Sequence, residues 1–281
     1  EQDSNFSDIS KIKFSEHHYS HAASAFLPSP FNEAIILTLD GVGEWATTTV
    51  AIGRDNKIDM IKEIHFPHSL GLLYSAFTYY TGFKVNGGEY KLMGLAPYGI
   101  PKYVDTILNN LINVKDDGSF KLNLKYFDYG TGLKMTNENF NDLFGQKVRN
   151  SKLEEITQFH MDIASSIQKV TENIVLKICK SLKNEYKIDN LCLAGGVALN
   201  CVANGNIYKE KIFKNIWVQP AAGDAGGALG AALAYYHLQK KNKRNINALD
   251  DMKGSYLGQE FDYKQIKNNL NKIGAKDKKF S

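Results

Sequence analysis

Three histidines lie close together near the start of the chain: His17, His18 and His21. Residues four apart share one face of an α-helix, so His17 and His21 would present two imidazole rings to a single metal ion. Ser15 is suited to cap the start of such a helix. The alternative is a surface helix whose histidines are there by chance. Two imidazoles leave a metal incompletely coordinated, so the rest of the chain must be searched for carboxylate ligands.

Two aspartates, Asp40 and Asp224, occupy glycine-rich turns at the ends of predicted strands. Glycine lets a backbone approach a ligand closely, free amides in such turns can hold phosphate, and a helix start favours an anion. An acidic side chain beside a phosphate makes sense if it holds a neutralising metal ion. The alternative roles are a simple turn residue for Asp40 and a helix N-cap for Asp224. The glycines of the two turns are Gly41, Gly43, Gly223, Gly226 and Gly227.

Two further segments could contact a nucleotide. Gly195 and Gly196 follow a short apolar run and would let a base or ribose lie on the backbone, although close packing of a helix on a strand explains them equally well. Glu89 and Lys91 lie in a predicted glycine-rich loop and could contact phosphate, or could be solvated charges. The sequence contains no complete Walker or dinucleotide-binding pattern, so each signal is weak alone.

The elements that must position these residues read as a β-meander followed by alternating helices and strands. This order predicts an α/β fold with a mixed sheet and helices on both faces. It fits the ribonuclease-H-like subdomain that actin-like ATPases use twice, with one complete copy here and part of the other. The expected strands span 33–44, 45–53, 58–66, 190–193 and 215–219, and the clearest expected helices span 69–83 and 154–183.

The chain divides into three predicted parts. Residues 1–31 would end the first actin-like subdomain and carry the histidine helix. Residues 32–245 would form the second subdomain, with an insertion of mixed structure at about 84–150. Residues 246–281 would be a linker with a final amphipathic helix, leading towards a further domain.

The composition is that of an ordinary globular protein. Of 281 residues, 43% are hydrophobic and 23% charged, and the net charge of +4 comes largely from a lysine-rich end. We therefore expect no nucleic-acid partner, and the sequence has no apolar stretch long enough for a membrane span. Three cysteines without a CxxC pair fit a reducing cytoplasm. The sequence is compatible with an oligomer as well as with a monomer.

The combination of motifs resembles a known family. The runs HHYSHAASAFLPSPF, LTLDGVGEW, SLGLLYSAFTYYTGF, GEYKLMGLAPYG, LAGGVALNCVANG and AAGDAGGALGAAL occur in that order between Glu16 and Leu257. Together they resemble the O-carbamoyltransferases of the nodulation-protein NodU and antibiotic-tailoring CmcH type. The resemblance implies an actin-like, Kae1-like domain joined to a C-terminal YrdC-like domain.

The resemblance also implies a reaction. The YrdC-like domain makes carbamoyl-adenylate from carbamoyl phosphate and ATP, and the actin-like domain transfers the carbamoyl group to a hydroxyl of a small molecule. A metal, usually iron as Fe(II), would be held by His17, His21, Asp40 and Asp224. The candidate contacts for the bound nucleotide are Gly41, Gly43, Glu89, Lys91, Gly195, Gly196, Asn200, Gly223, Gly226 and Gly227. The resemblance itself carries over only the metal ligands. It identifies neither the general base nor the acceptor.

By the same comparison, the family's opening segment is missing before Glu1 and the YrdC-like domain after about Gly258. We therefore expect that this chain cannot make carbamoyl-adenylate itself, and that alone it is inactive and binds metal or nucleotide weakly. Two alternatives remain: a threonylcarbamoyltransferase acting on tRNA, and a non-catalytic nucleotide-binding module. The second needs no paired histidines, so a stoichiometric transition metal would disfavour it.

Overall fold

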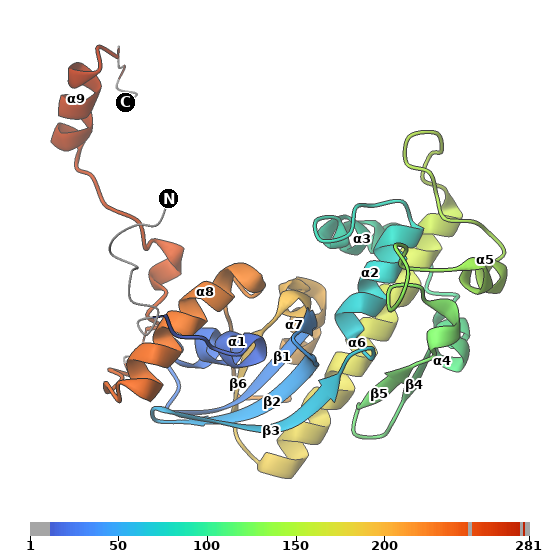
Figure 1. Ribbon diagram of the computed structural model, residues 1–281, viewed down its shortest axis with the longest axis horizontal. Helices are drawn as coiled ribbons and strands as arrows, with labels where there is room; N and C mark the ends of the chain where they lie inside the picture. The colour runs from blue at the N-terminus through green and yellow to red at the C-terminus, as the bar shows by residue number, and fades with distance from the viewer. Residues whose placement is uncertain (1–11, 247–248, 276–277, 279–281) are drawn as a thin grey trace.

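A five-stranded mixed sheet forms the centre of the computed structural model, which describes residues 12–246, 249–275 and 278 (Figure 1). The strand order is β3-β2-β1-β6-β7; β1, β2 and β3 are antiparallel, whereas β6 pairs parallel with β1 and β7 parallel with β6. This is the strand order of the ribonuclease-H-like unit, and the predicted fold class is confirmed. The strands are β1 (Glu33–Gly43), β2 (Ala46–Arg54), β3 (Lys57–His65), β6 (Asn190–Ala194) and β7 (Asn215–Val218).

Helices cover both faces of the sheet, which explains why β1 is an almost unbroken apolar run. On one face, Ile35, Leu37 and Leu39 join a core with α2 (Leu70–Tyr80) and α6 (Gln158–Tyr186). On the other face, Ala34 and Ile36 pack with α1 (His17–Phe26). The remaining helices of the sheet unit are α7 (Cys201–Lys209), between β6 and β7, and α8 (Asp224–Leu233), which packs on α1.

The long helix α6 begins four residues later than the sequence suggested. Thr157 and His160 form a reciprocal capping box at its start, and Lys187 ends it in the left-handed region with φ of 57°. Because His160 stands where Glu or Gln usually completes such a box, the boundary is hard to recognise in the sequence. The predicted apolar stripe is confirmed, since residues such as Ile163, Ile167 and Ile174 are buried.

The predicted insertion at 84–150 contains mixed structure, as expected, although its limits remain a prediction. Glu89 and Lys91, expected in a loop, lie in the first turn of a helix. Phe140 packs edge-on against Phe77 and Tyr80 of α2, which ties this part to the main core. Its elements are α3 (Glu89–Leu95), η3 (Ala96–Tyr98), α4 (Val104–Asn110), β4 (Ile112–Val114), β5 (Phe120–Leu122), η4 (Leu124–Tyr126) and α5 (Glu138–Phe144).

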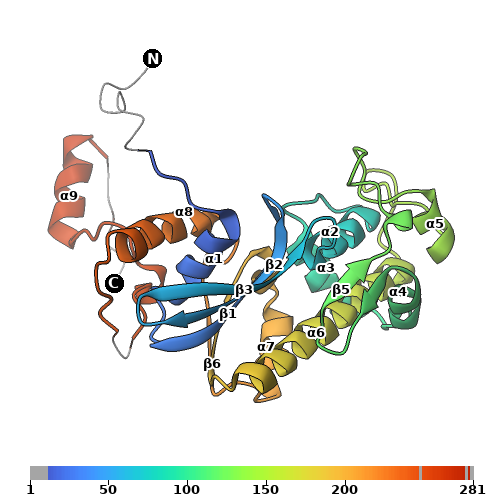
Figure 2. The same cartoon turned by 60° about the horizontal axis from the view of Figure 1, so that its bottom comes forward.

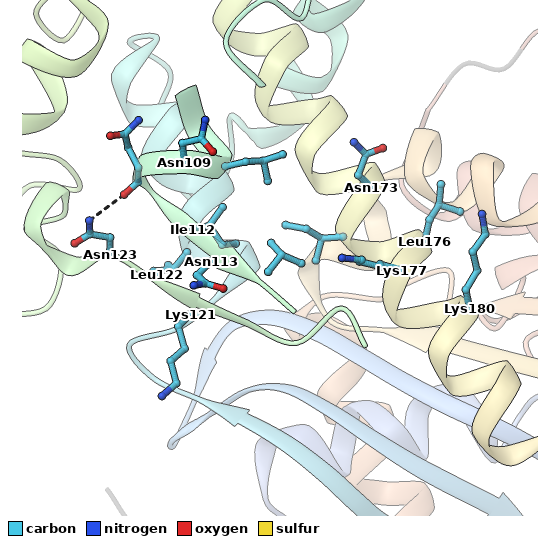
Figure 3. Close-up of a pocket in the computed structure, with 14 residues that line it drawn as sticks. Asn109, Ile112, Asn113, Lys121, Leu122, Asn123, Asn173, Leu176, Lys177 and Lys180 are labelled. Atoms are coloured by element: carbon cyan, nitrogen blue, oxygen red, sulfur yellow. Dashed lines mark hydrogen bonds between the residues drawn. The ribbon is translucent and has the colours of Figure 1, made fainter. Parts of the chain in front are cut away.

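A groove of about 920 Å³ lies between the β4–β5 hairpin and α6. Figure 3 shows asparagine and lysine side chains along it, including Asn113 and Lys121 from the hairpin and Asn173 and Lys177 from α6. Lys177 approaches Asp116 at 3.7 Å, and Asn123 donates to the carbonyl of Asn110. None of the histidines or aspartates singled out in the sequence lines this groove.

The C-terminal segment leaves the sheet unit after the π-helix η6 (Ala234–Gln239) and ends in η7 (Lys253–Ser255) and α9 (Tyr263–Lys272). Arg244 fixes the start of this segment, because its guanidinium donates to the carbonyls of Asp55, Phe26, Ser29 and Phe31. The predicted final amphipathic helix is confirmed as α9, which stands apart from the sheet in both views (Figures 1 and 2). Within the described ranges, no helix has the length and hydrophobicity needed to cross a membrane.

Of the predicted segment 1–31, residues 1–11 lie outside the described residues, as do 247–248, 276–277 and 279–281 of the predicted segment 246–281.

Candidate metal centre

The histidine helix α1 lies against the sheet with most of its surface covered. It begins at His17, with Glu16 rather than Ser15 in the N-cap position, and Glu16 makes no side-chain cap. The Ser15 hydroxyl instead accepts a hydrogen bond from the Ser20 hydroxyl at 2.9 Å. Burial of the alanines and Phe26 against the sheet fixes which way the helix faces, and His17 and His21 contact Asp40 near the end of β1.

The two imidazoles and two carboxylates converge on one point. The Nε2 atoms of His17 and His21 are 2.9 Å apart, and the Asp40 Oδ2 atom lies 2.9 Å from the first and 3.2 Å from the second. Asp224 Oδ1 lies 3.4 Å from His17 Nε2 and 3.7 Å from His21 Nε2. One ligand atom from each of the four residues falls within 4.8 Å of all the others. We call these four residues the ligand cluster.

Asp40 stands where β1 leaves the sheet register. Its Oδ1 accepts the backbone N–H of Gly196 at 2.9 Å, which leaves Oδ2 facing the histidines, and the Ser69 hydroxyl donates to its carbonyl at 2.9 Å. Burial acts to raise the pKa of Asp40, but hydrogen bonds from His17, His21 and Gly196 together bring that pKa well below its usual range. Asp40 therefore presents an ionised carboxylate to the two histidines, which is more than a simple turn residue would do.

Asp224 is the first residue of α8, and Gly223 is the N-cap, so the alternative N-cap role for Asp224 is wrong. Its side chain is 80% exposed. The position of α8 depends on Gly230, where an added Cβ would lie 1.8 Å from the carbonyl oxygen of Ser20 in α1. Only glycine permits this approach of α8 to α1, and the approach brings Asp224 to the histidines.

The donor set fits a divalent metal. Metal–ligand bonds of about 2.1 Å place neighbouring ligand atoms about 3.0–3.4 Å apart, and the separations of the pairs that include a histidine, 2.9–3.7 Å, bracket that range. Two imidazole nitrogens facing each other and two carboxylate oxygens are acceptors for a cation unless protons are placed between them. Two histidines and two carboxylates suit Fe(II), Mn(II) or Zn(II). The four residues are those that the sequence analysis and the resemblance pointed to.

The surroundings of the rings differ from those of most metal-binding histidines, which donate their second N–H to a protein acceptor. The Nδ1 atom of His21 is buried without a partner among the described residues. His18 is separate from the ligand cluster: its Nδ1 is 2.6 Å from the Thr38 hydroxyl, which in turn is 2.6 Å from that of Thr49. Burial lowers the pKa of His18 to about 4, so this ring is neutral at physiological pH.

Several positions expected to contact a nucleotide surround this cluster. Gly195 has φ of +87°, and a Cβ there would meet the carbonyl oxygen of Leu39 at 2.3 Å, so close packing of the turn on β1 accounts for this glycine. Gly41 and Gly43 lie in β1, and the glycines at 223, 226 and 227 lie at the start of α8. As nucleotide contacts, all of these stay predictions.

Glu89 and Lys91 lie on α3, which packs beside α2 and α6 and apart from α1 (Figures 1 and 2). The Glu89 carboxylate accepts hydrogen bonds from the backbone N–H groups of Asn86, Gly87 and Gly88 and from the Ser75 hydroxyl. Most of the hydrogen-bond acceptor sites of the Glu89 carboxylate are thus occupied by N–H groups of the preceding loop. Lys91 lies over the ring of Tyr90, with Nζ 5.9 Å from the ring centroid.

A second buried polar cluster joins α2, α6 and α7, and the sequence analysis recognised only one of its members, Asn200. The Gln168 carboxamide oxygen accepts from the Tyr74 hydroxyl and the Asn200 amide, both at 2.9 Å. Its nitrogen donates to Glu172 Oε1 at 2.9 Å and to Asn200 Oδ1 at 3.1 Å. A helical i, i+4 spacing of Gln168 and Glu172 is the only sequence signal for it. We call Tyr74, Gln168, Glu172, Asn200 and Asn206 the amide cluster.

Known proteins match most of this chain. Residues 2–233 match the family described as carbamoyltransferase N-terminus. The uncharacterized protein sll1178 of Synechocystis sp. is 61% identical over 94% of this chain and 43% of its own length. The nodulation protein NolNO of Sinorhizobium fredii is 39% identical over 80% of this chain and 31% of its own.

Among solved structures, full-length HypF in its phosphate- and nucleotide-bound form matches 80% of this chain and 43% of its own, with a TM-score of 0.45 and 13% identity. The chain thus spans less than half the length of the curated relatives it matches. The family match covers most of the chain and includes all four residues of the ligand cluster. The chain belongs to the carbamoyltransferase family.

Proposed function

We propose that this chain is the actin-like part of an O-carbamoyltransferase that passes a carbamoyl group from carbamoyl-adenylate to a hydroxyl of a small-molecule or natural-product acceptor. The observation that carries the proposal is the ligand cluster: four metal-binding side chains converge beside the glycine turns at 195–196 and 223–227. The chain is more similar to the nodulation protein NolNO than to tRNA N6-adenosine threonylcarbamoyltransferases, which supports an acceptor other than tRNA.

In this proposal His17, His21, Asp40 and Asp224 hold a divalent metal, with Fe(II) as our choice among the ions that suit the donor set. Bound there, the metal would supply Lewis-acid polarisation and a template for the phosphate oxygens of the adenylate. Helix α8 begins at Asp224, a member of the same cluster, and a helix start favours an anion.

The chain's own residues then supply position and charge. The ionised Asp40 carboxylate is fixed by the Gly196 N–H, so it cannot rotate away from the histidines without losing that hydrogen bond. The acceptor hydroxyl attacks the carbonyl carbon and gives up its proton to solvent, the bond from that carbon to the phosphate oxygen breaks, and AMP leaves. Holding both reactants beside one another accounts for much of the expected acceleration. His18 is neutral but buried on Thr38, and no side chain is assigned as general base.

The chain spans less than half of its relatives' length, and we propose that a YrdC-like domain makes the carbamoyl-adenylate donor. A cytoplasmic location supplies the ATP and carbamoyl phosphate that this reaction needs.

The test supplies labelled carbamoyl phosphate, ATP and a YrdC-like domain to the purified chain, with either hydroxylated sugars or tRNA as acceptor. Label in the sugar fraction, lost after chelation of metal, is the expected result. Label in tRNA would favour threonylcarbamoyl-type chemistry. No transfer together with no transition metal in the purified chain would favour a nucleotide-binding module.

A further inference from the structure

The tip of the β1–β2 hairpin holds the first ligand of the cluster. Helix α1 has no side-chain cap of its own, because the N-cap residue Glu16 makes none. The cap comes instead from 27 residues away: the backbone N–H of His17 donates to the carboxylate of Glu44, at 3.0 Å from Oε2 and 3.3 Å from Oε1. A carboxylate at a helix N-terminus is also favourably placed for the helix dipole.

The imidazole of His17 rests on the same tip. A Cβ on Gly43 would lie 2.3 Å from both Cγ and Cδ2 of the His17 ring, so the ring packs directly on the Gly43 backbone. The next residue, Glu44, has φ of 41°, and the β1–β2 register shifts between Leu39 and Gly43. This irregular tip therefore reaches His17 at two points, its backbone N–H and its ring.

The contact of the hairpin tip with His17 affects the geometry of the proposed metal centre. Within the described residues, neither ligand histidine is oriented through its Nδ1 atom, which is how most metal-binding histidines are held. The hairpin tip replaces that restraint for His17. The hairpin holds His17 at three points: the ring contacts Asp40 through Nε2 and packs on Gly43, and the backbone N–H donates to Glu44.

We propose that Glu44 is a positioning residue of the metal centre, and that with Gly43 it sets His17 at bonding distance from the metal held by Asp40. One hairpin then supplies one ligand and places another. The proposal rests on the metal of the proposed function. Metal sites require placement of their ligands to within about 0.5 Å, so a loose first turn of α1 would weaken binding even in a folded chain.

The experiment measures Zn(II) affinity by competition with a chromophoric chelator, and the Co(II) absorption spectrum, in the wild-type chain, Glu44→Ala and Glu44→Gln. Loss of an orienting contact costs about tenfold or more in metal affinity. We expect that loss in Glu44→Ala with an altered Co(II) spectrum, and substantial rescue in Glu44→Gln, which keeps an acceptor for the His17 N–H. The matched control is Glu33→Ala, at the other end of β1, where an exposed pair with Arg54 is removed.

A second measurement does not need metal. In the metal-free chain labelled with ¹⁵N-histidine, the amide of His17 should exchange with solvent faster in Glu44→Ala than in wild type or Glu33→Ala. If Glu44→Ala does not fold, Gly43→Ala replaces it, with the expectation of weaker metal binding as the ring is displaced.

The outcomes separate this inference from the proposed function. Wild-type Zn(II) affinity and an unchanged Co(II) spectrum in Glu44→Ala would overturn the positioning role. A wild-type chain that takes up no metal would overturn the metal centre of the proposed function. In that case, unchanged exchange of the His17 amide in Glu44→Ala would show that the hairpin does not hold His17 either.

Discussion

The ligand cluster and the amide cluster are both groups of polar side chains where helices meet, yet their hydrogen bonding differs. In the amide cluster, both atoms of the Gln168 carboxamide have two partners, and the Glu172 oxygens accept from Gln168 and Asn206. In the ligand cluster, nitrogen and oxygen acceptors face one another, and His21 keeps a buried nitrogen without a partner among the described residues. Complete hydrogen bonding marks a structural role, whereas converging acceptors mark a site for a cation.

The largest expected effect comes from removing both histidines. His17→Ala/His21→Ala should abolish stoichiometric metal binding, because two of four ligands are lost, while the free energy of unfolding of the metal-free chain changes much less. Elemental analysis measures the bound metal, and urea unfolding in EDTA measures the free energy of unfolding of the metal-free chain. A double variant that retains one metal per chain would show that the ligand cluster is not the site.

The amide cluster should behave in the opposite way. Gln168→Leu leaves Tyr74, Glu172 and Asn200 short of partners, so we expect a loss of about 2–4 kcal/mol in unfolding free energy with Zn(II) affinity within about twofold of wild type. The control is Asn173→Leu, an exposed position on the same helix, expected within about 0.5 kcal/mol. Weak metal binding by a folded Gln168→Leu chain would contradict the distinction between the clusters.

His18 lies beside the ligand cluster without belonging to it, and the pH dependence of stability tests whether its ring is buried and neutral. Burial lowers its pKa from 6.5 to about 4, so below pH 6.5 the unfolded chain takes up a proton that the folded chain resists. Its contribution to stability is therefore lost as the pH falls from about 6.5 to 4, at up to roughly 1.4 kcal/mol per pH unit. Urea unfolding of the metal-free chain at several pH values should show a shallower decline in His18→Asn than in wild type. Parallel curves would rule out a buried neutral His18.

The smallest effect should come from the exposed ligand. Asp224 has an 80% exposed side chain, so Asp224→Asn should change unfolding free energy by less than about 0.5 kcal/mol and weaken Zn(II) binding by about tenfold. Asp40→Asn, at the buried position, is the comparison and should bind metal more weakly still. Equal Zn(II) affinities in the two variants would show that the burial of a ligand does not determine how much it contributes to metal binding.

Local patterns in the sequence predicted much of this arrangement. The i, i+4 spacing placed His17 and His21 on one helix face, and the apolar run before Asp40 placed that residue at a strand end. Asp224 was a candidate N-cap as much as a ligand, and the family resemblance favoured the second role. What local pattern could not give were contacts between distant residues: Glu44 with His17, Gly230 with Ser20, and Gln168 with Asn200. These contacts depend on how whole elements pack against one another, and the periodicity of the sequence does not encode that packing.

The approach of α8 to α1 has a consequence for synthesis of the protein. His17 and His21 leave the ribosome first, Asp40 follows shortly after, and Asp224 follows about 180 residues later. At translation rates of about 5–20 residues per second, roughly 10–40 s separate Asp40 from Asp224. For that interval the nascent chain can offer a cation only three of its four ligands. In the proposed centre, full coordination becomes possible only once α8 has been made and has docked on α1, which makes it a late step in the folding of the sheet unit.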